Sequence, residues 1–307
     1  MSAQYHVPVM LSESIDALNV QSGKLYFDGT LGGAGHTSEI LRRGGNVIAV
    51  DRDMDAIDFS KMKLSGESDF SGRFTIVKDN FKNVKEVLSN NSITSLDGAI
   101  LDLGISSHQV DENSRGFSYS GSGILDMRMD RDQYLSAMTV VNEYTEEELS
   151  RIIYTYGEER YARKIAGAIV EARTKSRIES TRKLADIVKA CVPSFKGGHP
   201  AKRTFQAIRI EVNGELSGLG EAICDIVGAL ASGARIAVIS FHSLEDRIVK
   251  QTLKTLASNC ICDKSLPVCV CNHKASVKLI GKYKPTKEEI SANSRSQSAT
   301  LRVAEKL

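Results

Sequence analysis

The residues best suited to chemistry are a glycine-rich turn and two aspartates near the N-terminus. Asp28 ends an apolar run and leads directly into the turn Gly29-Thr30-Leu31-Gly32-Gly33-Ala34-Gly35-His36. Glycines let a ligand approach bare backbone, and Asp51 ends the next apolar run about 20 residues later, where a carboxylate accepts hydrogen bonds from both hydroxyls of a ribose. The same glycines are typical of a tight strand-to-helix turn without a ligand. Asp51 favours the cofactor interpretation, so we expect an adenosine-containing ligand.

The choice of cofactor depends on Asp28. No G-x-G-x-x-G register occurs at this turn and no G-x-x-x-x-G-K-[ST] sequence occurs in the chain, which disfavours dinucleotides and triphosphates. A carboxylate at the mouth of the turn repels a pyrophosphate but suits the cationic amino group of a methionine moiety, directly or through a water molecule. We therefore predict S-adenosylmethionine as the cofactor.

Four apolar runs, with helix-like segments after the first three, are expected to position these residues. The runs cover 25–28, 46–51, 73–78 and 97–103, a βαβ series whose composition is typical of a parallel sheet with helices on both faces. Helical periodicity follows in 146–156, 158–175 and 181–190, and strand-like runs return at 235–240, 277–280 and 299–303, with a helix over 244–256. The predicted fold class is α/β. A Rossmann-like methyltransferase domain is expected from residues 1–105 and 199–307, and an inserted, mostly helical domain for substrate recognition from 106–198. The expected hinge is Gly197-Gly198-His199-Pro200.

Composition agrees with a globular chain and excludes several classes of protein. The 307 residues are 41% hydrophobic and 25% charged, and they contain neither an apolar run of about 18 residues nor a signal-like N-terminus. We expect a cytoplasmic protein with no membrane partner. The formal net charge of +2 means that a nucleic acid would be bound by local basic patches and not by the overall field.

Basic residues on one predicted helix form such a patch. Helical spacing from residue 201 onward places Lys202 and Arg209 on one stripe with Gln206 and Asn213, and Arg203 is adjacent. The pattern suits contact with RNA phosphates, and a solvated basic face explains it equally well. A second basic group consists of Arg163, Lys164, Arg173, Lys175 and Arg177.

The sequence Ser240-Phe241-His242-Ser243 follows the strand-like run at 235–240. Ser243 is expected to be a helix N-cap, with Asp246 at the third helical position. Phe241 and His242 would then lie at the rim of the cofactor site, where the Phe241 ring could stack on an extruded base of the RNA. A packed, hydrogen-bonded ring is the more usual role for a histidine such as His242.

Four of the six cysteines form two C-x-C pairs, Cys260 with Cys262 and Cys269 with Cys271. Reduced thiols or metal ligands fit a chain of this size better than a disulfide framework. Strand-like alternation places all four thiols on one face of a hairpin, near His273. Structural zinc sites more often have C-x₂₋₄-C spacing, so free thiols are the favoured interpretation and a metal site is the alternative.

Several long motifs are similar to one known family. Together they resemble the MraW type of ribosomal RNA small subunit methyltransferase H, over nearly the whole chain. The motifs cover residues 6–11, 28–36, 51–53, 102–107, 115–118, 125–130, 156–160, 199–213, 240–247 and 298–305. The resemblance implies a Rossmann-like methyltransferase domain with an inserted helical domain. It also implies N4-methylation of a cytidine in the decoding region of 16S rRNA, within the small ribosomal subunit.

The resemblance also assigns residues to the cofactor by motif position. These are Ala34, Gly35, His36, Asp51, Phe81, Asp102 and Gln109. Two positions depart from the family pattern, Ala34 where many relatives have glycine and His108 where many have proline. Neither departure removes a side chain that the cofactor needs.

Asp102, at the end of the fourth apolar run, is the candidate catalytic residue. A hydrogen-bond acceptor on the N4 hydrogens of the target base would assist methyl transfer to that amine. Many amino-methyltransferases carry a D/N/S-P-P-aromatic sequence at this place, whereas this chain reads Asp102-Leu103-Gly104-Ile105. Catalysis, contact with adenine and capping of the following turn therefore all stay open for Asp102.

Two other functions compete with this interpretation. A methyltransferase for another RNA position or for a small molecule would bind the cofactor without methylating ribosomal particles. A non-enzymatic RNA-binding protein on the same fold would keep the basic patches and bind no cofactor. The intact aspartates at positions 28, 51 and 102 argue against the non-enzymatic alternative.

Overall fold

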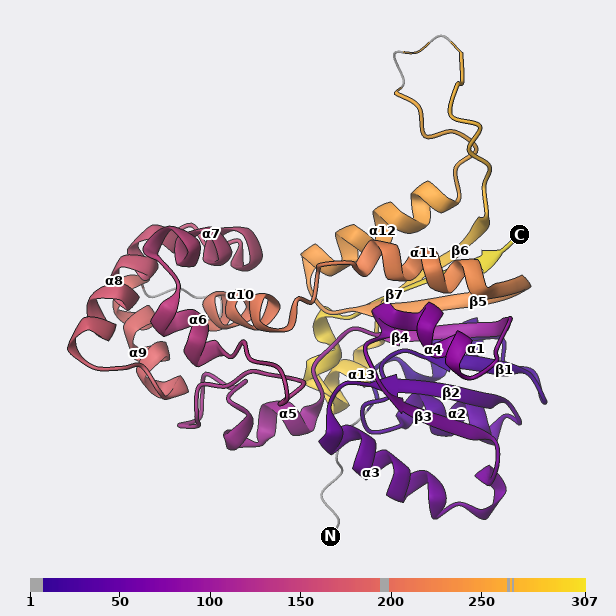
Figure 1. Ribbon diagram of the computed structural model, residues 1–307, viewed down its shortest axis with the longest axis horizontal. Coiled ribbons are helices and arrows are strands. Elements are labelled where there is room, and N and C mark those ends of the chain that lie inside the picture. The colour runs from indigo at the N-terminus through magenta and orange to yellow at the C-terminus, as the bar shows by residue number, and fades with distance from the viewer. Residues whose placement is uncertain (1–7, 194–198, 264–265, 267) are drawn as a thin grey trace. The chain divides into compact units, whose positions relative to one another are not determined.

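The computed structural model describes residues 8–193, 199–263, 266 and 268–307 (Figure 1). The chain divides into two compact units, one formed by Met1–Gly104 with Ser217–Leu307 and the other by Ile105–Leu216. Gly197 and Gly198 of the expected hinge lie outside the described residues, as does the start of the motif at residues 6–11.

A seven-stranded sheet forms the centre of the first unit, in the order β3-β2-β1-β4-β5-β7-β6. Strands β1 to β5 are parallel, and β7 pairs antiparallel with both β5 and β6. The order in which strands are added to the sheet reverses at β1, which pairs with β2 on one side and with β4 on the other. The carboxyl ends of β1 and β4 therefore form a topological switch point. The strands are β1 (Leu25–Asp28), β2 (Asn46–Asp51), β3 (Phe74–Lys78), β4 (Leu96–Asp102), β5 (Leu230–Ser240), β6 (Val277–Tyr283) and β7 (Thr300–Lys306).

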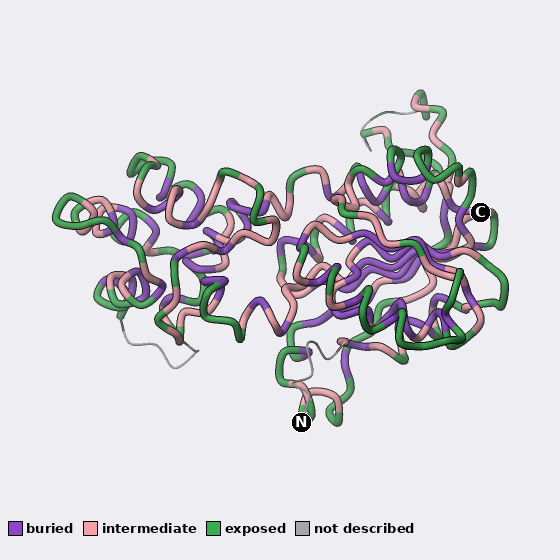
Figure 2. Tube along the Cα trace, turned by 60° about the horizontal axis from the view of Figure 1, so that its bottom comes forward, coloured by how far each residue is buried: buried purple, intermediate pink, exposed green. Residues whose placement is uncertain are grey.

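Alternating residues of the strands belong to two apolar cores, one on each face of the sheet. Ile48 and Val50 of β2 pack with helices α4, α11 and α12, whereas Val47 and Ala49 pack with α1, α2 and α3. The central strands β1, β2, β4, β5 and β7 are buried along most of their length (Figure 2), whereas the edge strands β3 and β6 are not. The helices of this unit are α1 (Leu11–Leu18), α2 (Gly35–Arg42), α3 (Met54–Ser65), α4 (Val84–Asn90), α11 (Leu219–Ala229), α12 (Ser243–Leu256) and α13 (Lys287–Ala292), with 3-10 turns η1 (Ser68–Phe70), η2 (Phe81–Asn83) and η4 (Ser294–Ser298).

The second unit is helical and has its own apolar core. Its elements are α5 (Ser107–Asp111), η3 (Asn113–Arg115), α6 (Ala137–Glu143), α7 (Glu146–Gly157), α8 (Ala162–Lys175), α9 (Thr181–Cys191) and α10 (Lys202–Asn213). Phe205, Ala207 and Ile208 of α10 are buried in the same core as Ile152 and Ile165 of α7 and α8.

The Rossmann-like α/β class predicted from the sequence is confirmed, and β7 adds an antiparallel strand to the expected parallel sheet. The second unit ends at Leu216, whereas the sequence suggested a return to the sheet domain at residue 199. The apolar face of α10 explains the difference, because it packs on α7 within the helical core. Among the described residues, no helix is both long and apolar enough to cross a membrane.

Candidate functional site

The glycine-rich turn connects β1 to α2 and is fixed to both neighbouring strands. The backbone N–H of Gly29 donates to Ile100 O of β4 at 3.0 Å, and that of Leu31 donates to Val50 O of β2 at 3.1 Å. Gly32 adopts a φ of 48°, and a Cβ added there would meet nothing closer than 3.8 Å. The turn is therefore a rigid loop whose backbone is open to a ligand.

Asp28 fixes this turn through hydrogen bonds of its side chain. Its side chain is buried and accepts hydrogen bonds from Thr37 Oγ1 at 2.6 Å and from the Thr30 backbone N–H at 3.0 Å. Burial raises the pKa of Asp28 to about 6, although the bonds from Thr37 and Thr30 oppose the shift. Asp28 therefore fixes the position of the loop, and the contact with an ammonium group that the sequence favours stays a prediction.

Asp51 lies at the end of β2, beside the same loop. Its Oδ2 accepts the Gly32 N–H at 2.8 Å and its Oδ1 accepts the Asp53 N–H at 2.9 Å. Burial raises the pKa of Asp51, while these two N–H groups lower it. The side chain is only partly buried. A carboxylate oxygen accepts two hydrogen bonds, so Asp51 retains acceptor capacity for the hydroxyls of a ribose.

Asp102 ends β4, and its backbone N–H donates to Thr30 Oγ1 at 2.6 Å. Its Oδ2 lies 3.9 Å from His36 Nδ1, and its buried Oδ1 has no hydrogen-bond partner within the described part of the chain. Burial, followed by the carboxylates of Asp28 and Glu245, raises the pKa of Asp102 to about 8. A buried acceptor left without a donor is costly, and a bound ligand with a donor or a positive charge would relieve that cost.

The other residues that the resemblance assigned to the cofactor lie in three places. Ala34 caps α2 with a left-handed φ of 54°, followed by Gly35 and the buried His36, so this group borders the loop. Phe81 in η2 lies against the loop, because its Cβ would be 2.9 Å from a Cβ placed on Gly29. Gln109 belongs to the helical unit, where it forms a capping box with Ser106 at the start of α5.

The segment after β5 is organised by Glu245. The N-cap of α12 is His242 and not Ser243, and the residue at the third helical position is Glu245 and not Asp246. Glu245 accepts the Phe241 N–H at 2.9 Å, and its Oε1 lies 3.1 Å from His242 Nε2. Phe241 packs against Gly104, where an added Cβ would be 2.7 Å from its ring. Serine was the expected cap because it is a common N-cap residue. His242 is the cap instead, because Glu245 stands at the third helical position after it and completes a capping box.

The basic stripe expected on α10 separates into exposed and paired members. Lys202 and Arg203 are exposed, and Arg203 donates to Glu158 O at 3.2 Å. Arg209 forms two hydrogen bonds of 2.8 Å with Glu215, and both side chains are largely buried. The ion pair explains why Arg209 is a poor candidate for phosphate contact. In the second basic group, Arg163, Lys164 and Arg177 are exposed.

Sequence reasoning missed the internal contacts of this helix. Asn213 is buried, accepts the Met129 N–H and donates to Met127 O, each at 2.8 Å. The sequence gives no signal for these contacts, because Met129 and Met127 lie 84 and 86 residues before Asn213 along the chain. The four clustered cysteines do come together, on a hairpin away from the aspartates.

Known proteins of one family are similar to this chain over nearly its whole length. The model of the MraW methylase family matches residues 3–307. The chain is 46% identical to ribosomal RNA small subunit methyltransferase H of Finegoldia magna over 98% of either chain. It is 48% identical to the protein of the same name from Clostridioides difficile over 99% of either chain. Among solved structures, the crystal structure of a putative rRNA-methylase from Clostridium thermocellum is 14% identical with a TM-score of 0.46, over 98% of this chain and 99% of that chain.

Proposed function

Because the chain belongs to the MraW methylase family, we propose that it is an S-adenosylmethionine-dependent methyltransferase of small-subunit ribosomal RNA. One observation carries the proposal. Over nearly its whole length, the chain is 46% and 48% identical to two proteins named ribosomal RNA small subunit methyltransferase H. The finer proposal, from the motif resemblance, is N4-methylation of a cytidine in the decoding region of 16S rRNA.

The residues at the carboxyl edge of the sheet fit this cofactor. S-adenosylmethionine supplies an activated methyl group on a sulfonium. Asp51 accepts hydrogen bonds from the ribose, the turn around Gly32 provides open backbone, and Phe81 borders the loop. The unsatisfied Oδ1 of Asp102 favours a ligand that brings a donor or a positive charge to this place. Asp28 contributes by fixing the loop through Thr30 and Thr37.

Asp102 has two roles in this proposal, of which cofactor contact comes first. Its second role is to accept a hydrogen bond from the target amine, which frees the nitrogen lone pair for attack. The raised pKa, about 8, suits a group that exchanges a proton near neutral pH. The chain needs no strong base, because holding the amine in line with the methyl group supplies much of the rate enhancement.

Exposed cations of the helical unit are proposed to bind RNA phosphates. Lys202 and Arg203 on α10 and Arg163 and Lys164 on α8 project into solvent. A cation contributes to RNA affinity in proportion to the counterions that its contact releases. Phe241 is proposed to stack on a flipped base, and the small ribosomal subunit is the partner that presents that base.

Nucleoside mass spectrometry of 16S rRNA, from cells with and without this protein, tests the function. We expect N4-methylcytidine to fall when the protein is absent and to return with the wild-type chain or with Asp58→Ala, a change on the exposed face of α3. Asp51→Ala should fail to restore it. Cofactor binding with unchanged 16S rRNA would favour another methyl acceptor, and absence of cofactor binding would favour a non-enzymatic protein.

A further inference from the structure

A hairpin projects from the sheet unit between the end of α12 at Leu256 and the start of β6 at Val277 (Figure 1). Hydrogen bonds close its base. The Ser276 N–H donates to Leu256 O at 2.8 Å, the Ala275 N–H donates to Asn259 Oδ1 at 3.2 Å, and His273 Nε2 lies 3.0 Å from Thr255 O. Both C-x-C pairs lie beyond this base, one on each arm.

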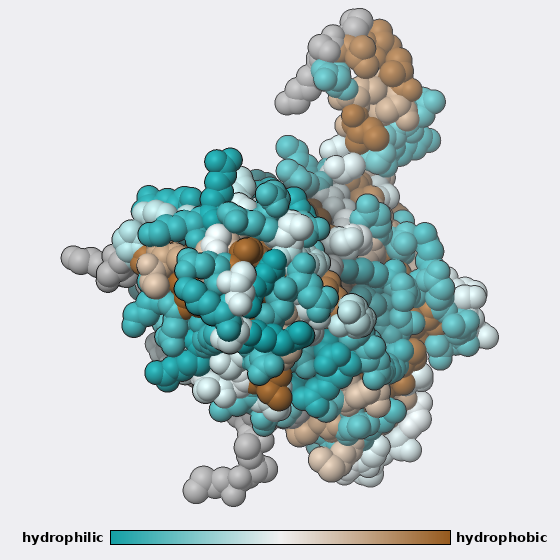
Figure 3. Space-filling model, turned by 60° about the vertical axis from the view of Figure 1, so that its left-hand side comes forward, coloured by the Kyte–Doolittle hydropathy of each residue, from teal (hydrophilic) through white to brown (hydrophobic). Residues whose placement is uncertain are grey.

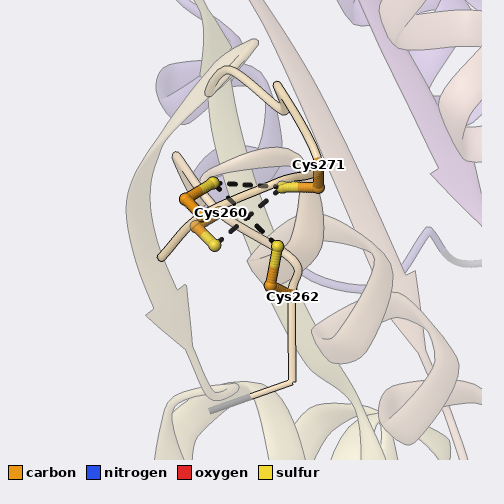
Figure 4. A group of neighbouring side chains, drawn as sticks. Cys260, Cys262 and Cys271 are labelled. Carbon is orange, nitrogen blue, oxygen red and sulfur yellow. Dashed lines mark hydrogen bonds between the residues drawn. The ribbon is translucent and has the colours of Figure 1, made fainter. Parts of the chain in front are cut away.

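The four sulfurs form a compact group. Cys262 Sγ lies 4.0 Å from Cys269 Sγ, Cys269 Sγ lies 3.6 Å from Cys271 Sγ, and Cys271 Sγ lies 3.9 Å from Cys260 Sγ. All four lie within 4.8 Å of one another. Figure 4 shows Cys260, Cys262 and Cys271 with their sulfurs turned toward one another.

These separations match the edges of a metal-centred tetrahedron. With zinc–sulfur bonds of about 2.3 Å, a regular tetrahedron has sulfur–sulfur edges of about 3.8 Å. Three of the six sulfur–sulfur separations, 3.6, 3.9 and 4.0 Å, lie close to that value, and all six are within 4.8 Å. A one-residue spacer suffices here, because the sulfurs of Cys269 and Cys271 lie 3.6 Å apart across such a spacer and all four sulfurs gather at one place. The unusual spacing therefore does not argue against a metal.

Backbone N–H groups support the sulfurs reciprocally. The middle residue of the first pair, Ile261, donates to Cys271 Sγ at 3.4 Å, and the middle residue of the second pair, Val270, donates to Cys262 Sγ at 3.3 Å. Each of these N–H groups reaches from one arm to a sulfur of the other. The contacts also fix the register of one arm against the other.

In the described part of this hairpin, no buried apolar side chain holds the two arms together. No described residue between 257 and 276 is buried. Ile261, Leu266, Val268 and Val270 are exposed, and apolar side chains gather on the projecting hairpin in Figure 3. No helix or strand forms among the described residues between 257 and 276, so the compact sulfur group calls for another source of stability.

We propose that Cys260, Cys262, Cys269 and Cys271 bind one zinc ion as four thiolates and that the ion stabilises the hairpin. Each thiol gives up its proton, so four thiols and Zn²⁺ yield a tetrathiolate complex of charge −2 and four protons. Zinc is favoured over other soft metals because four protein ligands close the coordination sphere and a structural site needs no redox change. The proposal does not depend on methyl transfer, because none of these residues belongs to the cofactor site.

The test is the metal content of the full-length, untagged chain, purified under reducing conditions without chelator. Elemental mass spectrometry should find about one zinc per chain in the wild type and nearly none in Cys262→Ser/Cys269→Ser. The matched control is Cys224→Ser, an exposed thiol on α11 outside the cluster, which should retain zinc. Cobalt exchanged into the wild type should give thiolate-to-cobalt charge-transfer bands that the double variant lacks.

Three results would overturn the proposal. They are a wild-type chain without zinc that also gives no thiolate bands with cobalt, zinc that persists in the double variant, and iron in place of zinc. The cobalt measurement uses the wild type, so poor folding of a variant cannot obscure it. Removal of zinc by a chelator should increase tryptic cleavage at the exposed Lys274 while the melting temperature of the sheet unit changes little. Equal cleavage with and without zinc would also count against the site.

Discussion

Asp102 leads to a prediction about cofactor binding that is independent of catalysis. Its carboxyl group lies at the end of β4, with one oxygen unsatisfied among the described residues and a pKa raised from 3.8 to about 8. Burial is the main cause, and Asp28, Glu245 and Glu289 add to it, while the Gly104 N–H opposes it. At neutral pH the group therefore holds its proton. A cationic cofactor next to it should expel that proton, because a positive charge favours the carboxylate.

The size of the effect follows from the fraction of Asp102 that is ionised before binding. With a pKa of about 8, roughly 1% is ionised at pH 6 and about half at pH 8. If the cofactor binds only the carboxylate form, its apparent affinity is reduced by that fraction, so affinity should rise about 50-fold from pH 6 to pH 8. The sign is fixed, because raising the pH supplies the form that attracts the cation.

Calorimetric titration of the wild type and Asp102→Asn across this pH range measures the effect. The amino group of S-adenosylmethionine itself titrates near pH 8, so the ratio of the two proteins' affinities isolates the contribution of Asp102. The wild type should release close to one proton per cofactor at pH 7, detected in buffers of different ionisation enthalpy, and the variant should release less. The same pH dependence in both proteins, with equal proton release, would refute the reasoning.

Four further predictions concern single residues. Asp51→Ala should weaken cofactor binding about tenfold or more, because it removes the acceptor beside Gly32, whereas Asp58→Ala should not; calorimetry compares them. Since the pKa of Asp102 is raised on folding, the folded state keeps a proton that the unfolded chain loses above pH 4, so stability should fall as pH rises from about 4 to 8. Urea unfolding of Asp102→Asn should show a shallower fall, and a parallel one would contradict the shift. Lys202→Ala should reduce the salt dependence of RNA binding by about one counterion without changing stability. Arg209→Ala should instead lower stability, because it leaves Glu215 largely buried without its partner. An unchanged salt slope in Lys202→Ala would remove that residue from the RNA interface.

The sequence allowed the sheet and its acidic edge to be predicted because both depend on local pattern. Apolar runs at 25–28 and 46–51 coincide with β1 and β2, and each ends in the aspartate that the loop contacts. Strands buried on both faces must be apolar throughout, so their limits are visible as the first polar residue. The start of β5 at Leu230 was less visible, since its exposed Ser232 and Gly233 do not resemble a strand.

What the sequence could not predict depends on contacts between side chains. Helical spacing correctly places Lys202 and Arg209 on one stripe, but it cannot tell that Glu215, beyond the turn at Gly214, pairs with Arg209. The cap of α12 is a similar case, because His242 and Ser243 are both capable caps and only the position of Glu245 decides between them. Residue types indicate what a side chain can do, whereas its partners decide what it does.

The carboxylates of Asp28 and Asp102 end two neighbouring strands and repel each other. Asp28 stabilises the turn through Thr30 and Thr37, yet its charge also raises the pKa of Asp102 on the next strand of the sheet. An asparagine at position 102 would avoid that repulsion and keep an acceptor oxygen, so the turn alone gives no reason for a second acid. A ligand that carries positive charge gives a reason for the second acid, because it attracts the Asp102 carboxylate that the charge of Asp28 repels. In the proposed site, the cost of Asp102 in the free protein would be the source of its selectivity for a cationic cofactor.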